Sequence, residues 1–284
     1  MESKCTGAGG RHRRVSQSQL RLGYPIAWSA GILSEVVELP TQSDSAARSA
    51  RSGALARRAA RWLGAVLVAA GVLGIAWTLT VWLWQDPFTA VYTNVQQHRL
   101  AASYERRVER FVAPSLPKDV TAAQEQRIVT AAARRYRDEV AKGEAIGRIR
   151  VPGLGLNMVL VAGTDHDSLT KGPGLDPRTF MPGQQELVYI AGHRTTYLAP
   201  FAHIDRMQAG DRVTLELPYA TFVYRVTGHK IVPADDLSQL KSHGREVVAL
   251  QACHPRFFAS QRYIVFAVPV RVIPRKGPSY TPRA

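Results

Sequence analysis

The distribution of apolar and polar residues divides the chain into four parts. Residues 1–61 are rich in Ser, Gly, Ala and Arg and show little periodicity, which is typical of a segment without a packed core. Residues 62–84, WLGAVLVAAGVLGIAWTLTVWLW, are apolar and carry no charge. Residues 85–144 contain mostly helix-forming side chains, and from residue 145 onward short β-rich runs alternate with Gly, Pro and Asp. The pattern predicts a tail, a long apolar helix, a helical linker and a β domain.

The apolar segment is long enough to cross a membrane. As a helix rising 1.5 Å per residue, residues 62–84 would measure about 35 Å, against a hydrocarbon core of about 30 Å. Trp stands at both ends, as in the interfacial aromatic belt of a spanning helix. The alternatives are a buried helix of a soluble protein and a cleaved signal peptide, but the run exceeds a usual signal-peptide core and no Ala-x-Ala site follows it. We therefore expect an uncleaved membrane helix.

Basic residues predict the orientation of this helix. Arginines at positions 48, 51, 57, 58 and 61 precede the apolar run, and the Arg-rich side of a membrane helix stays in the cytoplasm. We expect a disordered cytoplasmic tail over 1–61, an extracellular helical stalk over 85–144, and an extracellular domain after it, in a single-pass protein of the plasma membrane. The arginines account for part of the formal net charge of +15. Because no zinc-finger or RNA-binding signature accompanies this charge, we expect no nucleic-acid partner.

The region after the apolar run has separate helical and β signals. Thr121-Ala-Ala-Gln124 has the pattern of a capping box, and helix-forming residues continue to Lys142 before Gly143, which predicts a helix over 121–142. Short runs separated by turn residues then predict one mainly β domain over 145–275, a barrel or a sandwich, with 276–284 as a C-terminal tail. The runs are AIGRIRV, NMVLVAG, ELVYIAG, DRVTLEL, TFVYRVTGHKIV, EVVALQA and QRYIVFAVPVRVI.

Cys253 is the leading candidate for chemistry because it would be the one thiol outside the membrane. Cys5 would lie on the cytoplasmic side, so the two cysteines are not expected to pair. Cys253 has three open roles: a buried apolar side chain, a metal ligand or a nucleophile. A zinc site would recruit His193, His254 or His166, but no Cys-x-x-Cys or His-x-x-x-His pair is present. We therefore expect neither a metal nor a cofactor.

A nucleophilic thiol needs a proton-transfer partner and a donor for the oxyanion. Strand alternation places Cys253 and His254 on opposite faces, so the adjacent histidine is a poor partner. His193 ends the run ELVYIAG and begins a polar loop, which makes it the better candidate. Arg262 begins the run QRYIVFAV, and if the two strands are neighbours its guanidinium lies at the same end of the domain as the thiol. Taken one at a time, a structural histidine and a solvated arginine near a turn are the better interpretations.

Together the three residues resemble a known family. His193 within AGHRTTYLAPF, and Cys253 and Arg262 within LQACHPRFFASQRYIVFA, resemble the His, Cys and Arg of the sortases, the cysteine transpeptidases of Gram-positive envelopes. The preceding RIRVPGLGLNMVLVAGTDHDSLTKGPG is similar to the N-terminal part of the sortase barrel, and GHRTTY and CHPRF are most similar to class E of the actinobacteria. The resemblance covers residues 145 to about 273 and implies a closed β-barrel of about eight strands with short helices.

The resemblance also implies a reaction and its partners. Cys253 would attack the Thr–Gly carbonyl of a Leu-Ala-x-Thr-Gly-like sorting signal on a secreted protein, while Arg262 stabilises the oxyanion and His193 protonates the leaving amine. An amine of a peptidoglycan precursor or a pilin would resolve the thioester. Tyr197, Thr196 and Ala252 are the candidates for substrate binding.

Two places depart from the family pattern. Gln251 and Ala252 stand before the nucleophile, where sortases usually have Thr or Ser, and Leu198 follows Tyr197 where glycine is common. Neither removes a catalytic group, but both bear on substrate preference and efficiency. They motivate an alternative function, a catalytically weak or silent wall-binding module on the same fold.

Overall fold

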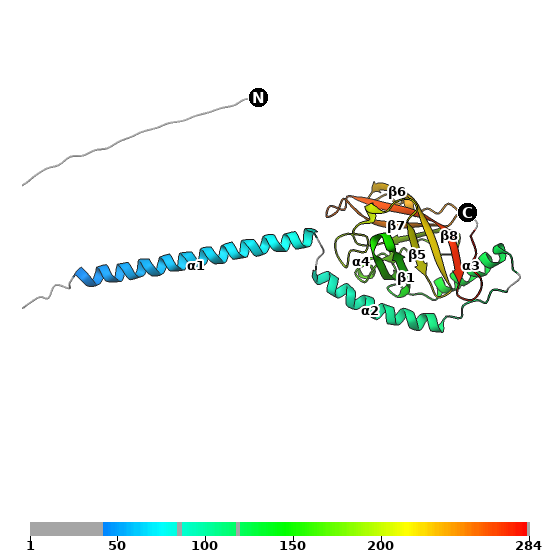
Figure 1. Cartoon of the computed structure of the whole chain (residues 1–284), viewed down its shortest axis with the longest axis horizontal. Coiled ribbons are helices and arrows are strands. Elements are labelled where there is room, and N and C mark those ends of the chain that lie inside the picture. Colours follow the sequence, from blue (N-terminus) through cyan, green and yellow to red (C-terminus); the bar gives the residue numbers. More distant parts are fainter. Residues whose placement is uncertain (1–41, 84–86, 118–119, 283–284) are drawn as a thin grey trace, which may run out of the picture. The chain divides into compact units, whose positions relative to one another are not determined.

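The computed structural model of the chain describes residues 42–83, 87–117 and 120–282 (Figure 1). The predicted tail up to residue 41 lies outside the described residues, as do residues 283–284 of the predicted C-terminal tail. The chain divides into two compact units, Met1–Gly64 and Ala65–Ala284. The second unit contains the whole β domain.

The first helix contains the apolar run. Helix α1 spans Gln42–Leu83, so it begins well before Trp62, because Ala and Arg in the preceding segment are good helix formers. Within it, Gly53–Thr80 is long and apolar enough to cross a membrane, and none of its most apolar window is buried. Among the described residues it is the one helix with this property. The prediction of an apolar helix that can serve as an anchor is consistent with this length and composition.

Two further helices precede the β domain. Helix α2 is Pro87–Arg110 and helix α3 is Ala122–Asp138. The predicted capping box is confirmed, because the backbone N–H of Gln124 donates to the Thr121 hydroxyl and the Thr121 N–H donates back to the Gln124 side chain at 2.8 Å. Helix α3 ends at Asp138 rather than at Lys142. The chain then turns, with the N–H of Ala141 bound to the Glu144 carboxylate at 2.9 Å.

The β domain is a closed barrel of eight strands, which confirms the predicted fold class. Their order around the barrel is β1-β2-β3-β4-β7-β8-β6-β5, with β1 also paired to β5. The pairs β2–β3 and β4–β7 are parallel and the others are antiparallel. The strands are β1 Ala145–Val151, β2 Leu156–Ala162, β3 Gly174–Leu175, β4 Leu187–Ala191, β5 Arg212–Glu216, β6 Ala220–Pro233, β7 Val247–His254 and β8 Gln261–Pro274.

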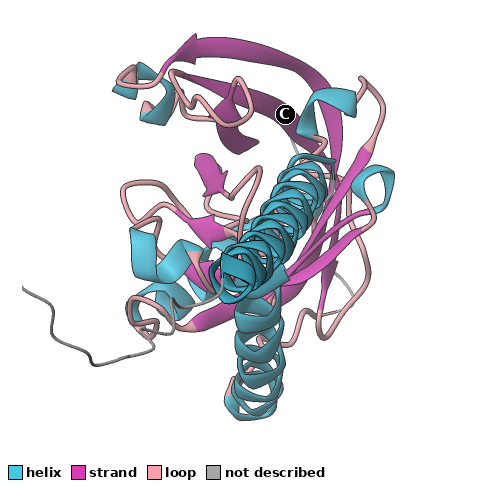
Figure 2. Cartoon of the chain, turned by 90° about the vertical axis from the view of Figure 1, so that its left-hand side faces the viewer, coloured by secondary structure: helices cyan, strands magenta, loops and turns pink. Residues whose placement is uncertain are grey.

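Short helices lie at the ends of the strands, where Figure 2 shows them beside the magenta strands. Their positions are η1 Pro152–Leu154, α4 His166–Leu169, η2 Ile204–Arg206 and η3 Leu237–Leu240. Strand β3 has only two residues, and no run in the sequence predicted it. It is held by pairing on both sides, to β2 and to β4, rather than by its own propensity.

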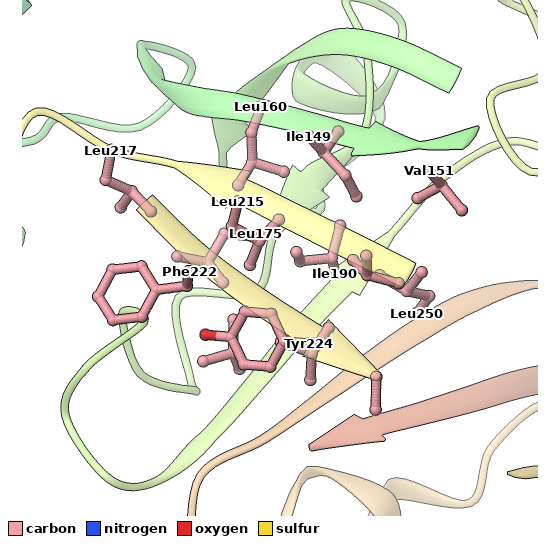
Figure 3. Packing of buried hydrophobic residues seen from close by; sticks show 14 of the residues in the cluster. Ile149, Val151, Leu160, Leu175, Ile190, Leu215, Leu217, Phe222, Tyr224 and Leu250 are labelled. Carbon is pink, nitrogen blue, oxygen red and sulfur yellow. The ribbon is translucent and has the colours of Figure 1, made fainter. Parts of the chain in front are cut away.

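Alternation along each strand separates the interior of the barrel from its outer face. In β7, Val248, Leu250 and Ala252 belong to the main core, which Figure 3 shows filled by aliphatic and aromatic side chains. Ala249 packs in a separate cluster with Leu187, Tyr189, Val232 and Ile264, on the outer face. Odd-numbered residues of β7 therefore point outward. Cys253 follows on this outer face.

Candidate active site

The three residues singled out in the sequence line one pocket. His193, Cys253 and Arg262 border a cavity of about 300 Å³ at one end of the barrel, on the outer face of β4, β7 and β8. Its floor includes Tyr189 and Gln251. One wall comes from the end of β6 and the segment after it, through Val232, Ala234, Asp236, Leu237 and Leu240.

Strand pairing explains why residues distant in sequence meet here. The parallel pair β4–β7 aligns Ala191 with Gln251, and the Gly192 N–H donates to the Gln251 carbonyl at 3.0 Å. His193 and Cys253 each stand two residues beyond this aligned pair. In the antiparallel pair β7–β8, Cys253 lies directly opposite Arg262. Strands β7 and β8 are therefore neighbours, as predicted. The parallel pairing of β4 with β7 brings His193 to the same end of the barrel.

Gly192 is required for this arrangement by close packing. A Cβ at this position would lie 2.7 Å from Cδ2 of Phe201 and 3.1 Å from Cγ of Pro200. Phe201 is fully buried, and its N–H donates to the His193 carbonyl at 3.1 Å, so it cannot move without disturbing the histidine. The small residue before His193 therefore lets β4 end against the loop that follows it.

The side chain of His193 is half-buried, and its imidazole is available for proton transfer. In the described part of the chain, Nε2 is buried and makes no hydrogen bond to protein. The ring lies against Tyr197, with centroids 4.9 Å apart. Burial, and to a smaller degree the charge of His166, lower the pKa of His193 below its usual 6.5. A neutral imidazole with a free nitrogen can accept a proton and return it.

Arg262 is fixed by its own loop. Its Nη1 donates to the carbonyls of Ala259 at 2.8 Å and Gln261 at 2.9 Å. Among the described residues, neither Nε nor Nη2 of Arg262 meets a protein acceptor. A protonated guanidinium held in this way can offer its remaining N–H groups to an oxyanion that forms beside Cys253.

His254 does not take part in the pocket, as strand alternation predicted. It does not line the cavity, and its Nδ1 lies 2.9 Å from Nη1 of Arg194. Arg194 is buried, is paired with Asp205 at 2.9 Å, and donates to the Cys253 carbonyl at 3.3 Å. It therefore holds the backbone of the cysteine from behind. Its position directly after His193 was the one signal in the sequence that could have drawn attention to it.

A buried acidic residue in the pocket was also missed. Asp176 lines the cavity and accepts hydrogen bonds from Arg178 Nη2 at 2.7 Å and from the Thr164 hydroxyl at 3.1 Å. Burial raises its pKa, but these hydrogen bonds together outweigh burial and hold the pKa of Asp176 below its usual value. Asp176 and Arg178 also border a second cavity of about 520 Å³ next to α3. Their spacing in Asp-Pro-Arg was the available signal.

The three predicted substrate-binding residues do not line the pocket. Ala252 is fully buried in the barrel core, between two residues that point outward. Tyr197 lies beside the pocket, with its ring against His193 and 6.2 Å from that of His166. Thr196 belongs to the same loop, and its carbonyl accepts the Ala199 N–H. Leu198, where the family commonly has glycine, has a φ of 61°, in the left-handed region that favours glycine.

Comparison with known proteins identifies the β domain. Residues 149–270 match the family described as Sortase domain. The barrel has the fold of a sortase domain. Its sequence is 32% identical to Sortase D of Bacillus subtilis over 128 residues, which is 44% of this chain and 63% of that protein. It is 33% identical to Sortase SrtE1 of Streptomyces coelicolor over 96 residues, 30% of this chain and 27% of that protein. The chain thus covers less than two thirds of either relative.

A solved structure supports the same fold. The chain is similar to a Clostridium perfringens Sortase D5 transpeptidase, with a TM-score of 0.50 and 21% identity over 62% of this chain and 99% of that one. Similarity at this level concerns the arrangement of the strands. It does not by itself show the chemistry of the pocket in this chain.

Proposed function

We propose that this chain is a membrane-anchored cysteine transpeptidase of the sortase type. The observation that carries the proposal is the meeting of Cys253, His193 and Arg262 in one pocket of a sortase domain. The three groups supply a nucleophile, a proton carrier and an oxyanion donor, which are the parts that acyl transfer through a thiol needs.

The proposed reaction has two halves. In the first, His193 takes the proton of the Cys253 thiol, the thiolate adds to the Thr carbonyl of a sorting signal, Arg262 binds the oxyanion, and the C–N bond to Gly breaks as His193 donates that proton to the leaving amine. In the second, an acceptor amine adds to the thioester, His193 takes its proton, and the thiolate leaves as the new amide forms. The His193 nitrogen that has no partner is where both proton transfers would occur.

The substrate class is also a proposal. The class E resemblance and the partial match to Sortase SrtE1 support a Leu-Ala-x-Thr-Gly-like signal on secreted proteins, with a peptidoglycan or pilin amine as acceptor. The length of Gly53–Thr80 supports an anchor in the plasma membrane, with residues 1–61 in the cytoplasm, residues 85–144 as an extracellular stalk, and the catalytic domain outside. In the described residues no three His, Cys, Asp or Glu side chains gather as metal ligands do, so the geometry gives the zinc alternative no support.

The test is direct capture of the thioester. The full chain in detergent is mixed with a Leu-Ala-x-Thr-Gly peptide, with and without triglycine, and analysed by mass spectrometry. We expect an acyl adduct on Cys253 and a transpeptidation product, neither of them with Cys253→Ala. His193→Ala should nearly abolish turnover. Cleavage by the Cys253→Ala protein at the wild-type rate would refute the assignment, and the absence of any adduct in wild type would favour the silent wall-binding module.

A further inference from the structure

Helix α2 contacts the loop beside the active site through polar side chains. The Thr89 hydroxyl accepts the Tyr197 N–H at 3.0 Å. Thr93 is fully buried, and its hydroxyl donates to the Thr170 carbonyl at 2.8 Å. Gln97 donates to the Lys171 carbonyl at 2.8 Å and accepts the Val159 N–H at 2.7 Å. Positions 89, 93 and 97 are four residues apart, so they share one face of the helix.

The other half of the same helix docks mainly by apolar packing, together with the Tyr104 hydroxyl, which donates to the Glu216 carbonyl at 2.9 Å, and Arg107, which pairs with Glu144 at 2.6 Å. Leu100 and Tyr104 form a cluster with Ala145, Val159 and Val161 on the outer face of β1 and β2, beside which α2 runs (Figure 1). Apolar contact is not directional and does not by itself fix how far a helix slides or turns. The hydrogen bonds of Thr89, Thr93 and Gln97 are directional and fix that register. The position of the first turns of α2 relative to the loop that they contact is therefore fixed.

The loop that Thr89 holds has an unfavourable backbone. Tyr197, Leu198 and Ala199 have φ values of 54°, 61° and 38°, in the left-handed region that non-glycine residues seldom occupy, least of all in succession. Such a conformation persists only where the surroundings over-determine it. The hydrogen bond from Tyr197 to Thr89 is one restraint, and the bond from the Ala199 N–H to the Thr196 carbonyl at 2.8 Å is another.

The conformation of this loop decides what lies against the imidazole of His193. The Tyr197 ring contacts His193 from one side and also contacts His166 of α4. Helix α4 is followed by Thr170, which Thr93 binds. Two hydroxyls of α2 thus hold the loop that carries Tyr197 and the segment that carries His166, the other ring against Tyr197.

We propose that Thr89 and Thr93 of α2 are positioning residues for His193, so that the helix following the apolar segment completes the active site. The inference rests on the proposed function, because it concerns the proton-transfer step at His193. When α2 is docked, the Tyr197 loop keeps its left-handed conformation and the imidazole keeps its orientation. When the contact is lost, the loop relaxes to ordinary φ values and the imidazole gains freedom.

The test removes one hydroxyl and keeps the shape of the side chain. Thr89→Val is made in the full chain in detergent, with Thr89→Ser as the variant that retains the acceptor. Thr130→Val in α3 is the matched control, because the Thr130 hydroxyl also makes one hydrogen bond to the backbone, donating to the Gly183 carbonyl, away from His193. Turnover of a Leu-Ala-x-Thr-Gly peptide and the titration of His193 by nuclear magnetic resonance are the two readouts.

We expect Thr89→Val to lower kcat by about tenfold with KM changed less than about twofold, since a small misplacement of a catalytic group costs rate rather than binding. The pKa of His193 should rise toward 6.5 as the Tyr197 loop opens. Thr89→Ser should restore both values, and Thr130→Val should leave both unchanged.

Unchanged kcat and His193 titration in Thr89→Val would overturn the inference, and so would an equal loss in Thr130→Val, which would indicate a general effect on stability. If the wild-type chain forms no thioester, the proposed function fails. In that case the titration of His193 in the same variants, measured on folded protein, still decides whether α2 positions the imidazole.

Discussion

Replacing Glu246 with glutamine should change how the stability of the barrel depends on pH. Glu246 is buried just before β7, at the opposite end of this strand from Cys253. Its carboxyl accepts the Tyr224 hydroxyl at 2.7 Å, the Gly183 N–H at 2.9 Å and the Gln185 N–H at 3.2 Å. Burial raises the pKa of Glu246 from an ordinary 4.5 to about 7, against the opposing effect of these donors.

The raised pKa sets the sign and the size of the effect. The folded state holds the proton more tightly than the unfolded chain, so the stability that this proton confers is fully present below pH 4.5 and is lost as pH rises through 7. Between pH 5 and pH 8.5 the wild-type chain should lose about 2 to 3 kcal/mol of unfolding free energy through this group. A glutamine can still accept the two N–H groups with its oxygen and face Tyr224 with its amide, but it does not ionise.

The assay compares urea unfolding of the full chain in detergent at pH 5 and pH 8.5, followed by circular dichroism. The free energy of unfolding of Glu246→Gln minus that of wild type should rise by about 2 to 3 kcal/mol between the two pH values. Glu139→Gln removes an exposed carboxylate that pairs with Arg135 at 3.6 Å, and its difference from wild type should change little with pH. A flat difference for Glu246→Gln would refute the reasoning, because it would mean that the folded state keeps Glu246 ionised.

Three further predictions concern the neighbourhood of the pocket. Gly192→Ala should reduce turnover in a peptide-cleavage assay and lower the free energy of unfolding by about 2 kcal/mol. Gly228→Ala should leave turnover unchanged, because a Cβ at position 228 would have no atom within 4 Å. Arg194→Met should lower kcat and cost about 2 kcal/mol because it removes the donors to the Cys253 carbonyl and to Asp205. Arg206→Met, at an exposed position, should have little effect on urea unfolding, and equal effects would contradict the role of Arg194. In His166→Gln the pKa of His193 should rise yet stay below 6.5, since burial lowers this pKa more than the charge of His166 does. A pKa at or above 6.5 by nuclear magnetic resonance would show that burial is not the larger of the two causes.

Much of the site followed from local pattern. The apolar run in β7 predicted a strand ending near Cys253, and alternation alone separated Cys253 from His254. The short loop between two β-rich runs allowed Cys253 and Arg262 to lie at the same end of neighbouring strands, and the structure places them directly opposite each other. The end of α3 was predicted four residues too late, because helix-forming residues continue past Asp138 although the chain turns there, with the Ala141 N–H bound to the Glu144 carboxylate.

The sequence by itself determined the apolar helix, the mainly β class of the domain and the face on which the thiol lies, since these depend on side chains a few residues apart. Only the tertiary structure decided that β4 runs parallel to β7, that Arg194 supports the Cys253 backbone, and that Thr89 binds the Tyr197 loop. The partners in these contacts are about 60 to 108 residues apart in the chain. No local propensity specifies such pairs, because they form only when the whole core closes and each buried polar group must find a partner.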